Sequence, residues 1–284
     1  MIKDNLLAIV VSFNCNEGIN ETVSRLCAHV SQVLIVDNGS VSSSLMLLNK
    51  LSFKNLKIIE LRENFGIGYA LNIGVRHARE NGFPWILTMD QDTIIDEAFV
   101  NSMRICIERF PEVQSLAPVV VLNDVKKAIM TDAEVMCVIT SGHVVSTSVF
   151  ERVGLYNEEL FIDCVDFDFC LRLRNCGVKT IRVGSALIRH ELGGRHENTG
   201  WLSSFYSLHT PIRRYYIYRN FIYIIRTYML KFPLFIIKFA AAHILMISAI
   251  ILYEKQPWRN IKAISRGLKD GVAGRYGKVG GESF

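Results

Sequence analysis

The chain has 284 residues, half of them hydrophobic and 21% charged, which excludes extensive disorder and fits one large domain or one domain with an appendage. Residues 201–284 hold 13 Lys and Arg against 3 Asp and Glu, whereas residues 1–200 are net acidic. Because this basic tail is also apolar and aromatic, it favours an anionic lipid surface as partner, and we expect no nucleic-acid binding.

The first half of the chain alternates continuous apolar runs with segments of helical periodicity. The pattern predicts, in chain order, strand 6–12, helix 19–30, strand 33–36, helix 42–51, strand 56–61, helix 69–80, strand 85–89 and helix 96–109. This order predicts an α/β fold with a mostly parallel sheet and helices on both faces.

The middle of the chain is less regular, and its last third differs in composition. Strands are predicted at 135–140 and 179–183, with a helix over 163–176 between them. We therefore expect one domain over residues 1–210, with halves of about 1–117 and 118–210. A basic and apolar helical segment over 211–284 follows it.

The C-terminal segment contains an apolar run, Phe232–Tyr253, of membrane-spanning length. Lys238 and His243 interrupt the run and would make a simple span costly. The Arg and Tyr residues of 213–226 resemble an interfacial belt. We favour attachment to one membrane face; a single span, packing on the first domain, or a dimer interface are the alternatives.

Polar clusters follow the predicted strands at their carboxyl ends, where parallel sheets bind ligands. Asp90 and Asp92 come directly after the strand over 85–89. Two carboxylates one residue apart on an extended turn can approach a single hard cation, such as Mg²⁺ or Mn²⁺ at a diphosphate. The alternative is that they only cap the following helix.

A glycine-bearing loop joins the strand over 56–61 to the helix over 69–80. Gly66 and Gly68 allow close approach of backbone to a ligand, and the helix N-terminus offers free N–H groups to anions. The spacing is not that of the dinucleotide-binding fingerprint or of the Walker loop. Ordinary turn chemistry is the alternative.

Three aspartates begin the helix over 163–176. Asp163 and Asp166 can share one face, and an ionised aspartate there could accept the proton of an attacking hydroxyl. Asp168 should point elsewhere, and capping of the helix is the alternative role. His190 follows an apolar stretch; it is either structural or a third ligand of the cation.

Taken in order, these motifs resemble the family 2 glycosyltransferases with the GT-A fold, and among them the bacterial rhamnosyltransferases of surface-polysaccharide synthesis of the O-antigen type. The series comprises Val11-Ser12-Phe13-Asn14, Val36-Asp37-Asn38-Gly39-Ser40, Glu63-Asn64-Phe65-Gly66-Ile67-Gly68 with Asn72 and Gly74, Asp90-Gln91-Asp92, Val165-Asp166-Phe167-Asp168-Phe169-Cys170-Leu171-Arg172, and His190. The resemblance covers roughly Leu6 to Asn220.

The resemblance implies a Rossmann-like GT-A domain with a nucleotide-sugar half and an acceptor half. It implies a nucleotide-sugar site made by Phe13, Asn14, Asp37, Asn64, Gly68, Asn72, Asp90 and Gln91. Asp90, Asp92 and His190 would hold Mg²⁺ or Mn²⁺. Asp166 would be the catalytic base, with Asp163 as a substitute, because Val165 stands where the family commonly has Glu.

The implied reaction is transfer with inversion of L-rhamnose from dTDP-L-rhamnose to a hydroxyl of a glycan or lipid-linked acceptor. The enzyme would lie in the cytoplasm, peripheral on the inner face of the cell membrane, and could form a homodimer. A sugar nucleotidyltransferase is an alternative, although Ser12–Asn16 lacks the basic glycine-rich loop of that class. A non-catalytic, membrane-bound nucleotide-sugar binder is another, suggested by Val165.

Overall fold

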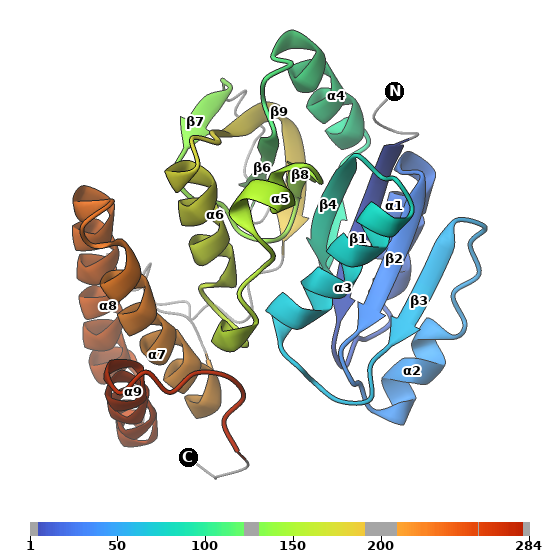
Figure 1. Cartoon of the computed structure of the whole chain (residues 1–284). Helices are drawn as coiled ribbons and strands as arrows, with labels where there is room; N and C mark the ends of the chain where they lie inside the picture. The colour runs from blue at the N-terminus through green and yellow to red at the C-terminus, as the bar shows by residue number, and fades with distance from the viewer. Residues whose placement is uncertain (1–4, 122–130, 191–208, 255, 281–284) are drawn as a thin grey trace. The chain divides into compact units, whose positions relative to one another are not determined.

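The computed structural model describes residues 5–121, 131–190, 209–254 and 256–280, with the side chain of His190 left out (Figure 1). The chain divides into two compact units. Unit 1 comprises Met1–Asn157 and Phe169–Glu191, and unit 2 comprises Glu158–Asp168 and Leu192–Phe284.

Unit 1 is an α/β layer structure, as predicted. Its strands are β1 (Leu6–Ser12), β2 (Gln32–Asp37), β3 (Leu56–Glu60), β4 (Trp85–Asp90), β5 (Thr93–Ile95), β6 (Ser115–Val121), β7 (Ala133–Val135), β8 (His143–Ser146) and β9 (Thr180–His190). Its helices are α1 (Ile19–His29), α2 (Ser42–Leu48), α3 (Ile67–Glu80), α4 (Phe99–Arg109) and α5 (Val149–Val153). Helix α6 (Val165–Asn175) begins among the residues of unit 2 and ends among those of unit 1.

The strands form one sheet in the order β3-β2-β1-β4-β8-β6-β9-β5, with β7 on β9. The four strands β3, β2, β1 and β4 are all parallel, because helices return the chain between them. Beyond β4 the sheet is mixed: β8 is antiparallel to both β4 and β6. The run of four parallel strands belongs to the N-terminal half, where the sequence alternates strand and helix, and in the mixed part β6 is parallel to β9.

Side-chain alternation along β1 gives the two faces of the sheet different helices. Leu6, Ala8 and Val10 join one core with residues of α1 and α4. Ile9 points to the other face, where α3 lies in front of the sheet in Figure 1. A Cβ on Gly74 of α3 would come within 2.5 Å of Ile9, so the helix lies against the sheet through a glycine.

The strand predicted over 135–140 is wrong in position. The structure has β7 at Ala133–Val135, and residues 136–140 lie outside regular structure. The backbone at 140–142 instead bonds to Thr88 of β4: the Thr88 hydroxyl donates to the carbonyl of Thr140 at 2.6 Å, and the Gly142 N–H donates to the Thr88 carbonyl at 2.8 Å. Strand β8 then begins at His143, which the sequence analysis did not predict.

Unit 2 is helical. It contains a short 3-10 helix, Glu158–Leu160, the first turn of α6, and helices α7 (Pro211–Tyr228), α8 (Pro233–Tyr253) and α9 (Pro257–Val272). Helix α9 lies against α7 so closely that a Cβ on Gly267 would meet the Tyr215 carbonyl oxygen at 2.4 Å.

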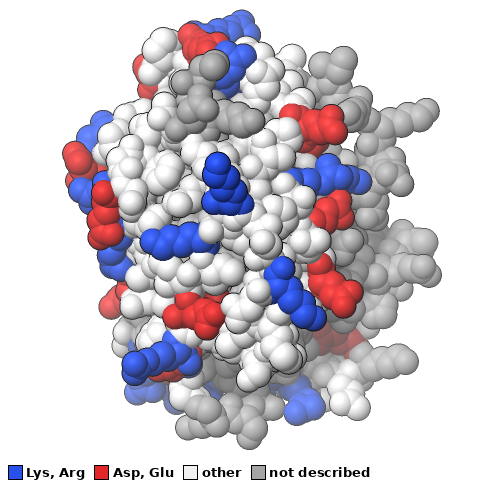
Figure 2. All heavy atoms as spheres, turned by 90° about the vertical axis from the view of Figure 1, so that its right-hand side faces the viewer, with Lys and Arg blue, Asp and Glu red and all other residues white. Residues whose placement is uncertain are grey.

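One face of the molecule carries charged side chains of both signs. Figure 2 shows one face, on which Lys and Arg are interspersed with Asp and Glu on a mainly uncharged surface. On that face neither charge forms a continuous patch.

Candidate active site

Three strand ends of unit 1 lie side by side at the carboxyl edge of the parallel sheet. Ser12 at the end of β1 is in register with Asp37 at the end of β2, and Val11 is in register with Asp90 at the end of β4. Together with the start of α3, these ends form what we call the strand-end edge: residues 12–14, 37–40, 64–68 and 90–92. The edge brings together the segments whose polar residues the sequence singles out.

Gln91 ties the turn after β4 to the end of β1. Its Oε1 accepts hydrogen bonds from the Phe13 N–H at 2.9 Å and the Ser12 hydroxyl at 3.2 Å. Gln91 Nε2 donates to the Phe13 carbonyl at 3.2 Å, and the Thr22 hydroxyl donates to the Gln91 carbonyl at 3.1 Å. The side chain between Asp90 and Asp92 therefore fixes where the two carboxylates leave the sheet.

Asp37 organises the turn after β2. It is fully buried, and its two carboxylate oxygens accept from the N–H and the hydroxyl of Ser40, at 2.9 and 2.5 Å. The same hydroxyl accepts from the Asn14 N–H at 2.7 Å. Asn14, at φ 50, accepts in turn from the Val41 N–H at 3.0 Å. Asp37 thus holds the Asn14 backbone in its left-handed conformation through Ser40.

Asn38 joins the same turn to the loop before α3. Its amide donates to Asn64 Oδ1 at 3.1 Å and its Oδ1 accepts from the Phe65 N–H at 2.9 Å. Asn64 Oδ1 also accepts from the Gly66 N–H at 2.9 Å. Gly39 lets the two backbones meet, because a Cβ there would lie 2.3 Å from the Glu63 carbonyl carbon.

The remaining predicted nucleotide-sugar residues differ in exposure. Gly68 is buried in the first turn of α3. Asn72 is also buried, and its amide exchanges two hydrogen bonds with the backbone of Tyr156, at 2.8 and 2.9 Å. Phe13 is exposed beside these strand ends, as is Phe65, whose ring lies 4.9 Å from that of Tyr69. The exposed rings of Phe13 and Phe65 suit stacking on a nucleotide base. Asn72 instead holds α3 to the backbone of Tyr156.

The carboxylates of Asp90 and Asp92 supply the oxygen donors that a hard divalent cation prefers. Asp90 is half-buried, its N–H donating to the buried Ser141 hydroxyl at 3.1 Å, and Asp92 is exposed. Thr93, the next residue, pairs with His190 across β5 and β9, which brings the His190 backbone beside the turn. The structure does not describe the His190 side chain, and among the described residues no three acidic, His or Cys side chains cluster closely enough to hold a metal.

In unit 2 the predicted acids lie on what we call the acid-bearing loop, residues 158–168. Asp166 is half-buried in the first turn of α6, where its Oδ1 accepts from the Phe167 N–H at 2.8 Å. Asp168 is fully buried and accepts from the hydroxyls of Tyr228 at 2.7 Å and Tyr223 at 3.2 Å. The tyrosines give Asp168 an anchoring role, and Asp166 is the more accessible of the two.

Asp163 forms an ion pair with Arg213, whose Nη2 lies 3.1 Å from Oδ1. Burial raises the pKa of the Asp163 carboxyl, and the Arg213 guanidinium offsets part of that rise. The ion pair occupies the Asp163 carboxylate, so an acceptor hydroxyl would have to displace Arg213 to reach it.

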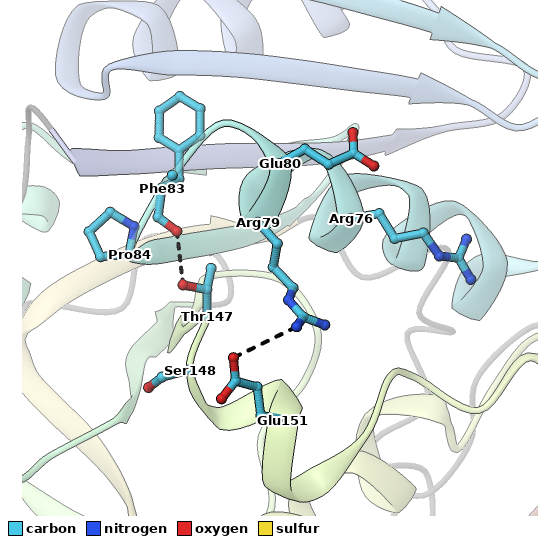
Figure 3. A pocket seen from close by; sticks show the side chains of 9 residues that line it. Arg76, Arg79, Glu80, Phe83, Pro84, Thr147, Ser148 and Glu151 are labelled. Atoms are coloured by element: carbon cyan, nitrogen blue, oxygen red, sulfur yellow. Dashed lines mark hydrogen bonds and ion pairs between the residues drawn. The ribbon is translucent and has the colours of Figure 1, made fainter.

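A hollow of about 620 Å³ in unit 1 lies at the end of the sheet opposite the strand-end edge, where β4 begins (Figure 3). Pro84, which precedes β4, and Thr147, whose hydroxyl donates to the Phe83 carbonyl at 2.9 Å, line it. Arg79 and Glu151 face each other across it at 3.7 Å. Ligands of parallel sheets bind at the carboxyl ends of the strands, so we do not assign the nucleotide to this hollow.

Comparison with known proteins relates the N-terminal part of the chain to one enzyme family. Residues 7–124 match the model of glycosyl transferase family 2. The chain contains a glycosyl transferase family 2 domain. The matched residues run from β1 past β6 and include the whole strand-end edge.

One relative and two solved structures extend this finding. The chain is 29% identical over 246 residues to dTDP-rhamnosyl transferase RfbF of Shigella flexneri, covering 79% of this chain and 81% of that protein. The S. aureus TarS fragment 1–349 in complex with UDP-GlcNAc superposes with a TM-score of 0.63 at 15% identity, covering 94% of this chain and 81% of that one. The mannosyltransferase PcManGT of Pyrobaculum calidifontis, in complex with GDP-Man and Mn²⁺, gives 0.56 at 15% identity, covering 95% and 86%. These structures confirm the predicted GT-A fold.

Several residues that shape both regions were not found from the sequence. Ser141 and Tyr228 act through single hydroxyls, which are too common in turns and helices to stand out. Arg219 was assigned to an interfacial belt, which is wrong for this residue, because Arg219 and Asn220 are buried in the middle of α7. The sequence did contain a signal for them: an adjacent Arg and Asn within an aromatic and apolar helix indicate buried polar groups that require hydrogen-bond partners.

Proposed function

We propose that the protein is an inverting rhamnosyltransferase that moves L-rhamnose from dTDP-L-rhamnose to a hydroxyl of a glycan or lipid-linked acceptor in cell-surface polysaccharide synthesis. The similarity to a dTDP-rhamnosyl transferase over about four-fifths of both chains supports the donor and the transferred sugar. The acceptor class rests on the resemblance of the motifs to the polysaccharide enzymes.

The observation that carries the proposal is the Asp90-Gln91-Asp92 turn on the strand-end edge. Gln91 holds the turn against the end of β1, beside the exposed ring of Phe13. Asp90 and Asp92 would hold Mg²⁺ or Mn²⁺, with His190 as a third ligand, and the bound cation would offset the negative charge of the diphosphate leaving group. Two solved neighbours were determined with Mn²⁺.

In the proposed reaction the strand-end edge and Asp166 have different roles. The strand-end edge binds the nucleotide and orients the sugar. Asp166 accepts the proton of the acceptor hydroxyl as its oxygen attacks the anomeric carbon from the face opposite the nucleotide. The new glycosidic bond forms as the bond to the diphosphate breaks, dTDP leaves with the bonding pair, and the configuration inverts.

Thermal unfolding with a panel of nucleoside diphosphates, each with and without Mn²⁺, tests this proposal. We expect dTDP with Mn²⁺ to raise the Tm by about 5 °C at 100-fold excess over its Kd. The shift should vanish in Asp92→Ala and persist in Glu97→Ala, a neighbouring exposed carboxylate outside the proposed site. A shift selective for UDP or GDP would overturn the rhamnose donor, and no shift with any nucleotide would favour a non-catalytic protein.

We further propose that unit 2 attaches the enzyme to the inner, cytoplasmic face of the cell membrane. Helix α8 is the one helix among the described residues that is long and apolar enough to cross a membrane, with 28% of its most apolar window buried. Leu234, Ile237, Ile244 and Ile251 recur on one side of it, and all are exposed. On α9, Trp258 is 79% exposed and is followed by Arg259 and Lys262. An exposed apolar stripe beside Trp and basic residues suits the interface of an anionic bilayer.

Flotation with vesicles of phosphatidylglycerol and phosphatidylethanolamine tests the attachment. The double substitution Ile237→Glu and Ile244→Glu should weaken binding by at least about tenfold, since each change removes apolar area and adds a repelled charge. Met46→Glu, an exposed apolar side chain of unit 1, is the matched control and should bind as the wild type does. Equal binding by all three proteins would contradict the proposal.

A further inference from the structure

The acid-bearing loop has a backbone that residues with a Cβ rarely adopt. Phe161, Asp163 and Cys164 all have positive φ values, of 62°, 63° and 63°. The left-handed region brings Cβ close to the carbonyl oxygen, so each of these conformations is unfavourable by itself. Such a run persists only where surrounding groups over-determine it.

Asn220 of α7 is the group that meets this loop most directly. Its side chain is fully buried, and its Nδ2 lies 2.8 Å from the carbonyl oxygens of Leu160 and Ile162 and 2.9 Å from that of Asp163. The two amide protons of Asn220 thus serve three carbonyl acceptors, so one proton is shared between two carbonyls. The carbonyl oxygen of the same amide accepts from Arg219 Nε at 3.0 Å.

Arg219, the preceding residue, holds the start of the loop. Its Nη2 donates to the carbonyls of Leu160 at 2.9 Å and Glu159 at 3.2 Å, and its Nη1 donates to that of Gly277 at 2.5 Å. The guanidinium lies 4.7 Å from the ring centroid of Tyr216, which keeps the buried charge in place. Adjacent residues of one helix therefore bind four carbonyls within residues 159–163.

These contacts end three residues before Asp166. Asp163, the last residue held through its carbonyl, is also held through its carboxylate by Arg213 of the same helix. From there the chain enters α6, whose second residue is Asp166. The direction in which α6 starts is thereby set by α7.

We propose that Asn220, supported by Arg219, is a positioning residue for Asp166. It fixes the strained loop so that the Asp166 carboxylate is held ready for the acceptor hydroxyl. This role rests on the proposed function, because it matters only if Asp166 accepts the proton. A residue that only stabilised unit 2 would change the stability of the enzyme and leave turnover per folded molecule unaltered.

Asn220→Ser tests this role, since the smaller hydroxyl donates one hydrogen bond where the amide serves three carbonyls. With dTDP-L-rhamnose as donor and a lipid-linked glycan acceptor, we expect kcat to fall by about 30-fold per folded molecule, with the donor KM nearly unchanged. Hydrogen exchange of the peptide covering 158–166 should become faster. Arg226→Met is the matched control, because Arg226 is another polar residue of α7 that donates to a backbone carbonyl, that of Val272 in α9 at 2.9 Å, outside the loop.

A double-mutant cycle separates the possible failures. In an Asp166→Asn background, Asn220→Ser should lower the residual rate by less than about twofold. The Asp166 carboxylate is absent from that background, so losing its positioning has no further effect. Equal losses in both backgrounds, or equal losses in Asn220→Ser and Arg226→Met, would overturn the positioning role. If Asp166→Asn keeps wild-type activity, the proposed base is wrong; if only Asn220→Ser keeps it, the positioning role alone is wrong. If Asn220→Ser does not fold, Arg219→Lys takes its place, with the same measurements of kcat, donor KM and hydrogen exchange.

Discussion

The strand-end edge and the acid-bearing loop present carboxylates in two different ways. At the edge, the turn with Asp90 and Asp92 is held by Gln91 between them, which bonds to the end of the neighbouring strand. In the loop, Asp166 follows a strained backbone that is held by Arg219 and Asn220, more than fifty residues later in the chain. The first arrangement is built into the sheet, whereas the second depends on a helix that must pack correctly.

On the proposed function, this difference would let one chain keep its donor-binding surface rigid and position its proton acceptor independently. Parallel strands fix the positions of their ends by backbone hydrogen bonds, so side chains there need only short links. A loop with three positive φ values has no such scaffold and requires side chains to satisfy its carbonyls. Substitutions in the two regions should therefore have separable effects.

The largest effect should come from Asp166→Asn. Loss of the proton acceptor should lower kcat by about 10³-fold, within the range typical of general bases. The affinity for dTDP, measured by calorimetry, should stay within about twofold of the wild type, because the proposed nucleotide site is the strand-end edge. Glu159→Gln, an exposed acid in the same loop, is the control. A wild-type rate in Asp166→Asn would remove the loop from the chemistry.

A smaller effect is expected from Gln91→Ala. The change removes the three hydrogen bonds between the turn and β1, so the carboxylates of Asp90 and Asp92 lose their fixed direction. We expect the donor KM to rise by about tenfold, equivalent to one or two net hydrogen bonds, with a lesser change in kcat. Steady-state kinetics against Gln114→Ala, a glutamine away from the edge, gives the comparison. An unchanged KM would mean that the turn is rigid without its brace.

The smallest effect concerns the stability of unit 1 rather than its chemistry. Burial lowers the pKa of His143 to about 3, while its Nε2 stays hydrogen-bonded to the Ser115 hydroxyl at 2.8 Å. The unfolded chain binds a proton near pH 6.5 and the folded chain does not, so stability falls as the pH drops below that value. Between pH 6.5 and 5 the loss attributable to this residue is about 2 kcal/mol.

His143→Gln keeps a polar partner for Ser115 and removes the titration. Urea unfolding followed at pH 7 and pH 5 should show a larger decrease in unfolding free energy for the wild type than for the variant. A matching decrease in the two proteins would mean that His143 is protonated in the folded state, or that the acid sensitivity arises elsewhere.

Much of unit 1 could be predicted from the sequence, for a physical reason. Strands buried on both faces leave continuous apolar runs, and β1 was predicted with the bounds that the structure has. Polar residues follow the strand ends, so the sequence predicts that the segments of the strand-end edge lie together. The short strands β5 and β8 were missed because three or four residues carry too little periodicity, and the seven-residue strand β6 was missed as well.

The support of the acid-bearing loop could not be predicted in the same way. The pairing of Asn220 with the carbonyls of residues 160–163 is a contact over 57 to 60 positions, and no local pattern specifies it. The separation of Asp168 from Asp166 was expected from their spacing, but the two tyrosines that anchor Asp168 lie 55 and 60 residues away. Predictions from periodicity describe elements well and their long-range polar contacts poorly.

The most direct test of the account compares Asp92→Asn with Asp166→Asn in one pair of measurements, dTDP binding with Mn²⁺ and rhamnose transfer from dTDP-L-rhamnose. We expect Asp92→Asn to lose both metal-dependent binding and transfer, and Asp166→Asn to bind dTDP normally while losing transfer. If Asp166→Asn lost binding as severely as Asp92→Asn, or if Asp92→Asn bound dTDP and transferred rhamnose like the wild type, the division between a donor-binding edge and an acid-bearing loop would be contradicted.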